Sequence, residues 1–266
     1  MAGGQARGPV SGALSSAGPI EVRPLRGHSE FAQAVELQRA VWQFEELELL
    51  PVRLFVVAEK VGGQTLGAFK NGCLIGFCLA IPGIRNGEVY LHSHMTGVLP
   101  EFRNAGAGRA LKLAQRDDAL ARGFKLVEWT FDPLELKNAH FNIERLGGVV
   151  TRYVLNQYGA TSSPLHAGLP TDRCTAQWWI RSPRVEAILA GRTSGIDVPQ
   201  ATSILGRISV PADIAEIKQH DPRRAREVQS RVSREFLEMI SKGWAAVGFE
   251  RSNDEGVYLL GPWQSE

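Results

Sequence analysis

The fold is decided by the stretch "VLPEFRNAGAGRALKLAQRDDALARGF" (residues 98–124), in which Gly106 and Gly108 stand directly before a run predicted to be helical over about 108–122. The first amides of a helix have no intrahelical partners, and the helix dipole places about half a positive charge there. Glycine lets a phosphate approach these amides because it has no Cβ. The stretch therefore predicts an anion-binding helix start, with a merely tight turn as the alternative.

Two common phosphate-binding motifs do not fit this segment. No Lys-Ser or Lys-Thr follows the glycines, as a P-loop requires. Leu111 occupies the third glycine position of a dinucleotide fingerprint, which would also need a parallel βαβ unit.

Composition sets the class of protein. The chain has 266 residues, 44% of them hydrophobic, and a formal net charge of +2, which gives no argument for a nucleic acid or a membrane as partner. The three cysteines do not have the spacing of metal ligands, so we expect no bound metal. We expect the protein to reside in a reducing compartment. Residues 1–19 are rich in Gly, Ala and Ser and predict a disordered leader; no apolar run is long enough to span a membrane. We therefore expect a cytoplasmic protein.

The pattern upstream of the glycines predicts an α+β fold with a mostly antiparallel sheet. A strand at 20–25 and helices at 29–42, with Ser29 as N-cap, and at 50–63 come first. Three strands joined by Asn-Gly turns then form a meander. The helix after the glycines is expected to bury Ala110, Leu113, Ala114, Leu120 and Ala121.

The rest of the chain continues this alternation. In a strand at 125–131, Leu126, Glu128 and Thr130 share one face, opposite Val127, Trp129 and Phe131. A short helix at 138–148 and strands near 149–155 and 174–180 follow. Residues 182–266 are interpreted as a C-terminal αβ extension with a linker-like start, a long basic helix and a hairpin. That helix carries Arg223, Arg224, Arg226, Arg231 and Arg234, and is expected to be a solvated face.

The segment "RNAGAG" (residues 103–108) matches the R/Q-x-x-G-x-G/A signature of the GNAT acyltransferases, and the order of elements over about 20–180 also resembles that family. The resemblance implies a GNAT fold over 20–181 and acetyl-CoA or another acyl-CoA as co-substrate. It implies that the loop amides bind the pyrophosphate and that the residues before the loop line the pantetheine arm. The cofactor residues so implied are Thr96, Gly97, Val98, Arg103, Asn104, Ala105, Gly106, Ala107, Gly108 and Arg109, with Asn138 and Asn142 near the sulfur.

The base that deprotonates an attacking amine has two candidates. "LHSHM" places His92 and His94 on one side of a strand that ends at the cofactor loop, and an imidazole suits proton removal at neutral pH. His94 is the expected base and His92 a substrate contact, with hydrogen-bonded structural histidines as the alternative. Glu128 is the competitor, because a carboxylate in a central strand needs either a structural partner or a role in a site.

The general acid stays open. Ile143 stands where many GNAT members carry a tyrosine, so Tyr153, Tyr158 or a water is left to protonate the thiolate. Asp132 follows a strand and either opens on the substrate or caps a turn. Asp172 and Arg173 either bind the acceptor or form an ion pair.

The sequence thus predicts an acyl-CoA-dependent N-acyltransferase that acts on the amine of a small molecule, an amino acid being one candidate. The acyl group is acetyl or larger, such as succinyl, and a homodimer is compatible with the sequence. The alternative is a GNAT-fold protein that binds acyl-CoA without turnover, which the absent tyrosine favours.

Overall fold

The computed structural model describes residues 18–192 and 203–263. The leader expected at 1–19 lies almost wholly outside these ranges, as does most of the linker-like stretch after residue 190. The elements of the first part are β1 (Ile20–Pro24), α1 (Gly27–Trp42), α2 (Val52–Lys60), β2 (Gln64–Lys70), β3 (Cys73–Arg85), β4 (Glu88–Val98), α3 (Ala107–Ala121) and β5 (Leu126–Phe131).

The second part adds helices and strands that complete the sheet. They are α4 (Leu136–His140), which runs into a π-helical turn (Phe141–Arg145), β6 (Val149–Val154), β7 (Arg173–Trp179), α5 (Pro183–Leu189), β8 (Gly206–Pro211), α6 (Ile214–His220), α7 (Pro222–Ser241), β9 (Trp244–Arg251) and β10 (Glu255–Pro262). The expected basic helix and C-terminal hairpin are confirmed as α7 and β9–β10. The sequence reading did not assign α5, β8 or α6.

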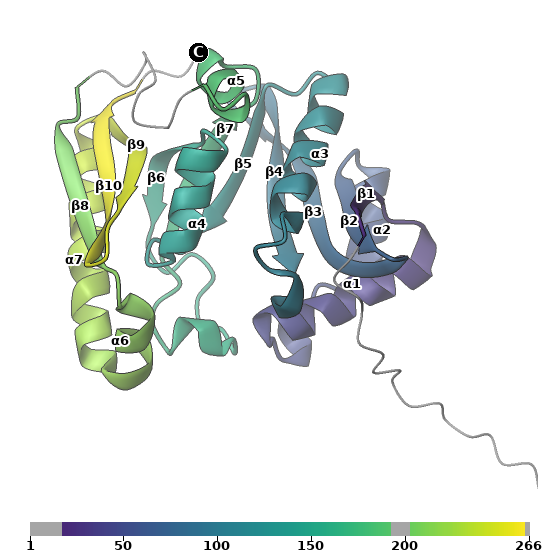
Figure 1. Ribbon diagram of the computed structural model, residues 1–266, viewed down its shortest axis with the longest axis horizontal. Helices are drawn as coiled ribbons and strands as arrows, with labels where there is room; N and C mark the ends of the chain where they lie inside the picture. The colour runs from purple at the N-terminus through teal and green to yellow at the C-terminus, as the bar shows by residue number, and fades with distance from the viewer. Residues whose placement is uncertain (1–17, 193–202, 264–266) are drawn as a thin grey trace, which may run out of the picture.

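One ten-stranded sheet runs through the molecule in the order β1-β2-β3-β4-β5-β7-β6-β9-β10-β8. Its neighbouring strands are antiparallel except β4 and β5, which pair in parallel only at Leu91–Val127 and His92–Glu128. Beyond these pairs the two strands diverge, so that the sheet opens into a V (Figure 1). This mixed, mostly antiparallel sheet flanked by helices is the α+β architecture that the sequence predicted.

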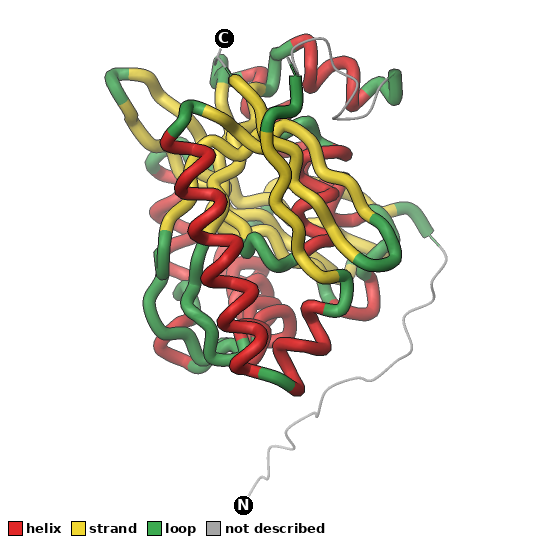
Figure 2. The backbone as a smooth tube through the Cα atoms, turned by 90° about the vertical axis from the view of Figure 1, so that its left-hand side faces the viewer, coloured by secondary structure: helices red, strands yellow, loops and turns green. Residues whose placement is uncertain are grey.

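Helices cover both faces of the sheet. In the first half, α1 and α2 bury Phe31 and Phe55 against Phe77 and Met95, and α3 packs Leu111 on the other face. In the second half, α7 lies across β6, β8 and β9 (Figure 2), while α4 lies on the same side of the molecule as α3 (Figure 1). Between these two halves, β4 and β5 are paired only at Leu91–Val127 and His92–Glu128.

Two local expectations were wrong. Helix α1 begins at Gly27 with Arg26 as N-cap and without a side-chain cap, so Ser29 lies inside the helix. Helix α3 buries Ala107, Leu111, Lys112, Gln115 and Ala119, a face rotated from the expected one. The hydrophobic pattern missed this face because two of its members are polar.

The C-terminal extension joins the same sheet. Strand β6 pairs with β9 at Val150–Ala246, and α7 packs Phe236 against Tyr153 of β6. The boundary proposed at residue 182 falls directly before α5 and stays a proposal.

None of the helices within the described ranges is both long and apolar enough to cross a bilayer.

Candidate active site

The loop before α3 is built to receive an anion. Asn104 (φ 64°) and Gly106 (φ 88°) both have left-handed backbone conformations, and Gly106 is the N-cap of α3 without any side-chain cap. A Cβ at Gly106 would meet nothing within 4 Å, and one at Gly108 only Val98 at 4.0 Å. Space is therefore left open above uncapped helix amides, which is the geometry that binds a phosphate. Arg103 is exposed beside this space.

The end of β4 offers a backbone edge that no strand occupies. Because β5 pairs only with Leu91 and His92, the following β4 residues, including Thr96, Gly97 and Val98, have no strand partner on that side. The Thr96 hydroxyl donates to Cys78 Sγ (3.4 Å), so its side chain faces α3. Gly97 is required by packing, since a Cβ there would lie 2.7 Å from the Trp42 ring. Backbone groups alone remain to receive the amides of a pantetheine-like chain.

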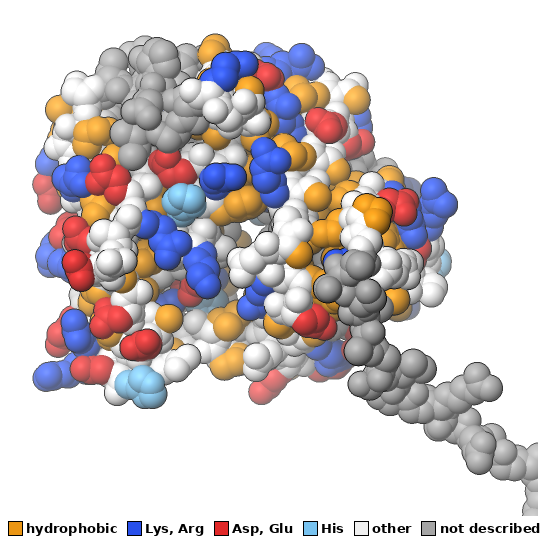
Figure 3. Space-filling model, viewed as in Figure 1, with side chains coloured by type: hydrophobic (Ala, Val, Ile, Leu, Met, Phe, Trp, Pro, Cys, Tyr) orange, Lys and Arg blue, Asp and Glu red, His pale blue; other side chains and the backbone are white. Residues whose placement is uncertain are grey.

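In the view of Figure 3 the surface is hollowed over the place where β4 and β5 diverge, and Lys and Arg side chains border the hollow. The loop, the free strand edge and the hollow together fit a coenzyme A molecule, whose diphosphate needs amides and whose arm needs a strand edge.

His92 and His94 stand at the vertex of the V. The register of β4 against β3 shifts so that Leu79 pairs with Met95 and Ala80 with Ser93, which leaves His94 in a β-bulge. The two imidazole centroids lie 6.0 Å apart. Within the described residues neither ring hydrogen-bonds to a protein group, unlike a histidine held for structure. Burial lowers the pKa of both rings, and for His92 the neighbouring His94 lowers its pKa further. Both are therefore neutral bases at pH 7.

Glu128 is held by arginines. Its carboxylate is 3% exposed and accepts both terminal nitrogens of Arg85 (2.7 and 2.8 Å), one of Arg152 (2.6 Å) and the amide of Gln177 (3.4 Å). Burial raises the pKa of Glu128, but the hydrogen bonds from Arg85 and the charges of both arginines outweigh burial and lower it. All its acceptor positions are used, which favours the structural-partner reading that the sequence left open.

A pocket of about 370 Å³ opens beside this cluster on the face away from α3. Glu128 and Thr130 lie on its floor, which confirms the predicted alternation of β5. The pocket is lined by Arg85, Tyr90, His92, Glu128, Thr130, Arg152, Val154, Gln157 and Thr175.

Two loops join at the open end of the V. Glu48, in the connection between α1 and α2, accepts from the Thr161 hydroxyl (2.6 Å) and from the backbone amide of Ser162. Glu45 N donates to the Ser162 hydroxyl (2.9 Å), and the Ser163 hydroxyl donates to the Trp42 carbonyl (2.6 Å). These hydrogen bonds link the first half of the sheet to the β6–β7 connection.

The short helix after β5 lacks a phenol. Ile143 is fully buried in the core and Asn142 is 5% exposed, whereas Asn138 is exposed. Tyr153 is also buried, donating to Asp172 (3.2 Å), so it cannot protonate a thiolate in the V. Tyr158 is exposed and hydrogen-bonds to Thr130 (2.8 Å), a residue of the pocket.

Asp132 and Asp172 have structural partners. Asp132 accepts from Leu134 N (2.8 Å) and from Lys218 Nζ (3.0 Å), which is the turn-capping alternative together with an ion pair to α6. Asp172 is 4% exposed and accepts from Ser233 (2.6 Å) and Asn156 N (2.8 Å). Arg173 donates to His166 and lies over the Tyr158 ring. The structure therefore does not bring Asp172 and Arg173 to the pocket of His92.

The sequence reading missed Lys112, Arg85 and Arg152. Lys112 of α3 is 4% exposed, donates to Ser93 (2.9 Å) and Gln115 (3.1 Å), and lies 3.9 Å from the centroid of the Trp129 ring. Burial lowers its pKa to about 8. Its place on the buried face of α3 could have been found only from the helix register. Arg85 and Arg152 gave no signal, because isolated arginines on strands are common.

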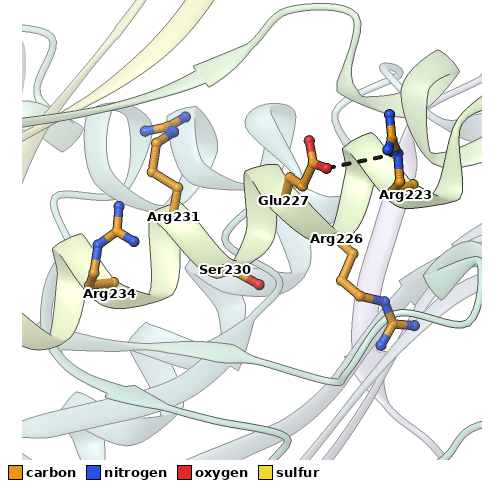
Figure 4. A pocket seen from close by; sticks show the side chains of 6 residues that line it. All are labelled: Arg223, Arg226, Glu227, Ser230, Arg231 and Arg234. Atoms are coloured by element: carbon orange, nitrogen blue, oxygen red, sulfur yellow. Dashed lines mark ion pairs between the residues drawn. The ribbon is translucent and has the colours of Figure 1, made fainter.

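The arginines of α7 form a second surface hollow (Figure 4), lined by Arg223, Arg226, Glu227, Ser230, Arg231 and Arg234. They point in different directions, and two have acidic partners one turn away: Arg231 with Glu235 (2.9 Å) and Arg223 with Glu227 (3.9 Å). This is the solvated face that the sequence predicted.

Comparison with known proteins shows a similarity to one family. Residues 30–147 match the sequence model of the Acetyltransferase (GNAT) family, which is less than half of the chain. This segment, from α1 to the turn before β6, is therefore similar to the GNAT acetyltransferases. A search of curated proteins finds no match.

Three solved structures that are similar to this chain are distant from it in sequence. The ribosomal-protein-S18-alanine N-acetyltransferase from Escherichia coli is 16% identical, with 62% of this chain and 96% of that chain covered and a TM-score of 0.48. Naa50 from Arabidopsis thaliana, in complex with the bisubstrate analogue CoA-Ac-MVNAL, is 15% identical, with 59% of this chain and 97% of that chain covered and a TM-score of 0.49. The putative acetyltransferase yncA from Salmonella typhimurium, with its cofactor acetyl-CoA, is 17% identical over 63% and 98% (TM-score 0.48).

Proposed function

We propose that this protein transfers an acetyl or larger acyl group from coenzyme A to the amine of a small molecule bound in the pocket beside His92. The observation that carries the proposal is the meeting of two sites at the V. The uncapped amides of α3 and the free edge of β4 lie on one side, and the pocket with its unpartnered imidazole lies on the other.

The acceptor amine attacks the thioester carbonyl directly. The C–N bond forms, the C–S bond breaks, the proton of the amine passes to the base, and the thiolate takes a proton and leaves as free CoA. His94 is the proposed base, in the bulge next to the V, with His92 contacting the acceptor. Backbone amides of β4 near Gly97 and Val98 are proposed to stabilise the oxyanion. Tyr158 or a water supplies the last proton.

A small acceptor is favoured over a protein chain because the joined loops cross the open end of the V. Glu48, Thr161 and Ser163 take part in that junction. A peptide lying along the V would have to break these hydrogen bonds, whereas an amino acid or a similar amine fits the pocket beside His92 without doing so.

Release of free CoA from acetyl-CoA and succinyl-CoA, measured with a panel of amines, tests the activity. Amine-dependent release supports the proposal; tight binding of acyl-CoA without any amine-dependent release would instead support the sensor alternative. His94→Gln should lower kcat by about a hundredfold if His94 is the base. His92→Gln is the matched variant, and a larger loss there would move the role to His92.

Coenzyme A binding has its own test. Gly108→Leu places a side chain in the open space above the amides, and calorimetry should show a weaker affinity for CoA. Gly108→Ala is the graded control, since its Cβ only touches Val98. Equal affinity in all three proteins would remove the loop from the cofactor site.

A further inference from the structure

The pocket beside His92 carries more positive than negative charge. Arg85 and Arg152 contribute two cations, Glu128 one anion, and burial keeps His92 neutral at pH 7. The remaining lining residues are uncharged in kind, among them Thr130, Gln157 and Thr175. An amine substrate that is cationic in solution would be repelled by such a pocket unless it brought an anion of its own.

Arg152 has unused hydrogen-bonding capacity. One terminal nitrogen donates to Glu128 (2.6 Å), while among the described residues Nε is buried without an acceptor and the second terminal nitrogen has none either. Its side chain is 41% exposed, so its outer edge reaches the pocket. Arg85 differs, because both its terminal nitrogens are used by Glu128.

The cluster also fixes the geometry of Arg152. The Glu128 carboxylate accepts hydrogen bonds from both Arg85 and Arg152. The Cζ atom of Arg85 also lies 4.5 Å from the centroid of the Tyr90 ring. A guanidinium held by one edge and open at another matches the planar, two-oxygen geometry of a carboxylate.

We propose that the acceptor is a zwitterion of the amino-acid type, whose carboxylate binds the free edge of Arg152 while its amine faces His92 and His94. This inference rests on the proposed acyl transfer, and it names the substrate class of that same pocket. Glu128 is then a positioning residue, which orients Arg152 and does not take the proton.

The test compares each of the twenty standard amino acids with its carboxamide, at fixed acetyl-CoA, by the release of free CoA. Loss of a charge-assisted hydrogen bond changes affinity by about 10- to 100-fold, so kcat/KM for the preferred acid should exceed that for its amide by this factor. In Arg152→Gln the acid-to-amide ratio should fall close to one. Arg234→Gln, an exposed arginine of α7 far along the chain, is the matched control and should keep the ratio.

A binding measurement tests the zwitterion inference separately from the proposed acyl transfer. Thermal unfolding of the wild type with CoA should shift upward with the preferred amino acid and less with its amide, and the difference should vanish in Arg152→Gln. Equal turnover of acid and amide would overturn the zwitterion inference and leave acyl transfer standing. No amine-dependent release with any acid or amide, together with no thermal shift, would overturn both.

Discussion

The buried lysine of α3 gives the sharpest prediction on stability. Lys112 is 4% exposed, and within residues 18–192 and 203–263 its ammonium has Ser93, Gln115 and the Trp129 ring as its partners. Burial lowers its pKa from 10.5 to about 8, which corresponds to about 3 kcal/mol between the two protonation states.

The sign of the pH dependence follows from proton binding. Below pH 8 the amine is charged in both states, and the folded state bears the full penalty of burying it. Between about pH 8 and 10.5 the folded protein has released this proton while the unfolded chain still holds it. Stability contributed by this group therefore rises with pH through that window and is constant on either side of it.

Lys112→Met replaces the titrating amine by an apolar side chain of similar volume. The variant loses two hydrogen bonds worth about 1 kcal/mol each, so it should be about 1 kcal/mol more stable than the wild type at pH 7 and about 2 kcal/mol less stable near pH 10.5.

Urea unfolding followed by circular dichroism at several pH values between 7 and 10.5 measures this difference. Lys137→Met is the matched control, because Lys137 is exposed on α4 and carries no burial penalty. Parallel pH profiles of Lys112→Met and the wild type would refute the reasoning, since the buried amine would then not titrate in this window.

Three further predictions concern the framework of the site. Lys218→Met leaves Asp132 without its buried lysine partner and should lower the free energy of unfolding by about 3 kcal/mol in urea titrations. Lys242→Met is the control, because it breaks an exposed pair with Glu238 and should change the free energy of unfolding by less than about 0.5 kcal/mol. Similar effects of the two substitutions would contradict the burial argument. Gly97→Ala drives a Cβ to 2.7 Å from Trp42 and should destabilise the fold by about 1–3 kcal/mol, with partial recovery in the double variant with Trp42→Phe; an unchanged melting temperature would show that the ring moves freely. Glu128→Gln should lower the free energy of unfolding by about 2 kcal/mol, a modest value because both arginines are partly exposed. The same variant should reduce kcat/KM more than kcat. A loss in kcat above about a thousandfold in a folded protein would instead identify Glu128 as the base.

Much of the fold could be predicted because its signals are local. Asn-Gly turns set the meander, and the period-two pattern of 125–131 placed Glu128 and Thr130 on one face. Gly106 indicated an unusual helix start, because the left-handed backbone there (φ 88°) favours glycine. Strand β8 and helix α6 escaped prediction, since short elements are ordered by tertiary packing rather than by their own pattern.

The acceptor side could not be predicted, because it is assembled by residues far apart in the chain. Arg85 and Arg152 converge on Glu128 only after β3, β4, β7 and β6 have paired around β5, and no spacing in the sequence encodes that meeting. The sequence also shows no sign of the β-bulge at His94. The side of the sheet on which His92 and His94 lie could therefore be predicted only from the simple alternation of a regular strand. Lys112 was missed for a different reason: an amphipathic reading treats every lysine as solvent-facing.

The pairing of β6 with β9 lets the last third of the chain support the strand that carries Arg152, the residue proposed to bind the acceptor. The strand that carries Arg152 pairs on its outer side with β9, whose first residue, Trp244, comes long after the end of β6 at Val154. The residue after Arg152, Tyr153, hydrogen-bonds to Ser233 of α7. Substitutions in that remote layer can tilt the guanidinium without touching the pocket. If Arg152 binds the acceptor as proposed, selectivity can change through this remote layer without any substitution at the proposed coenzyme A loop on the other arm of the V.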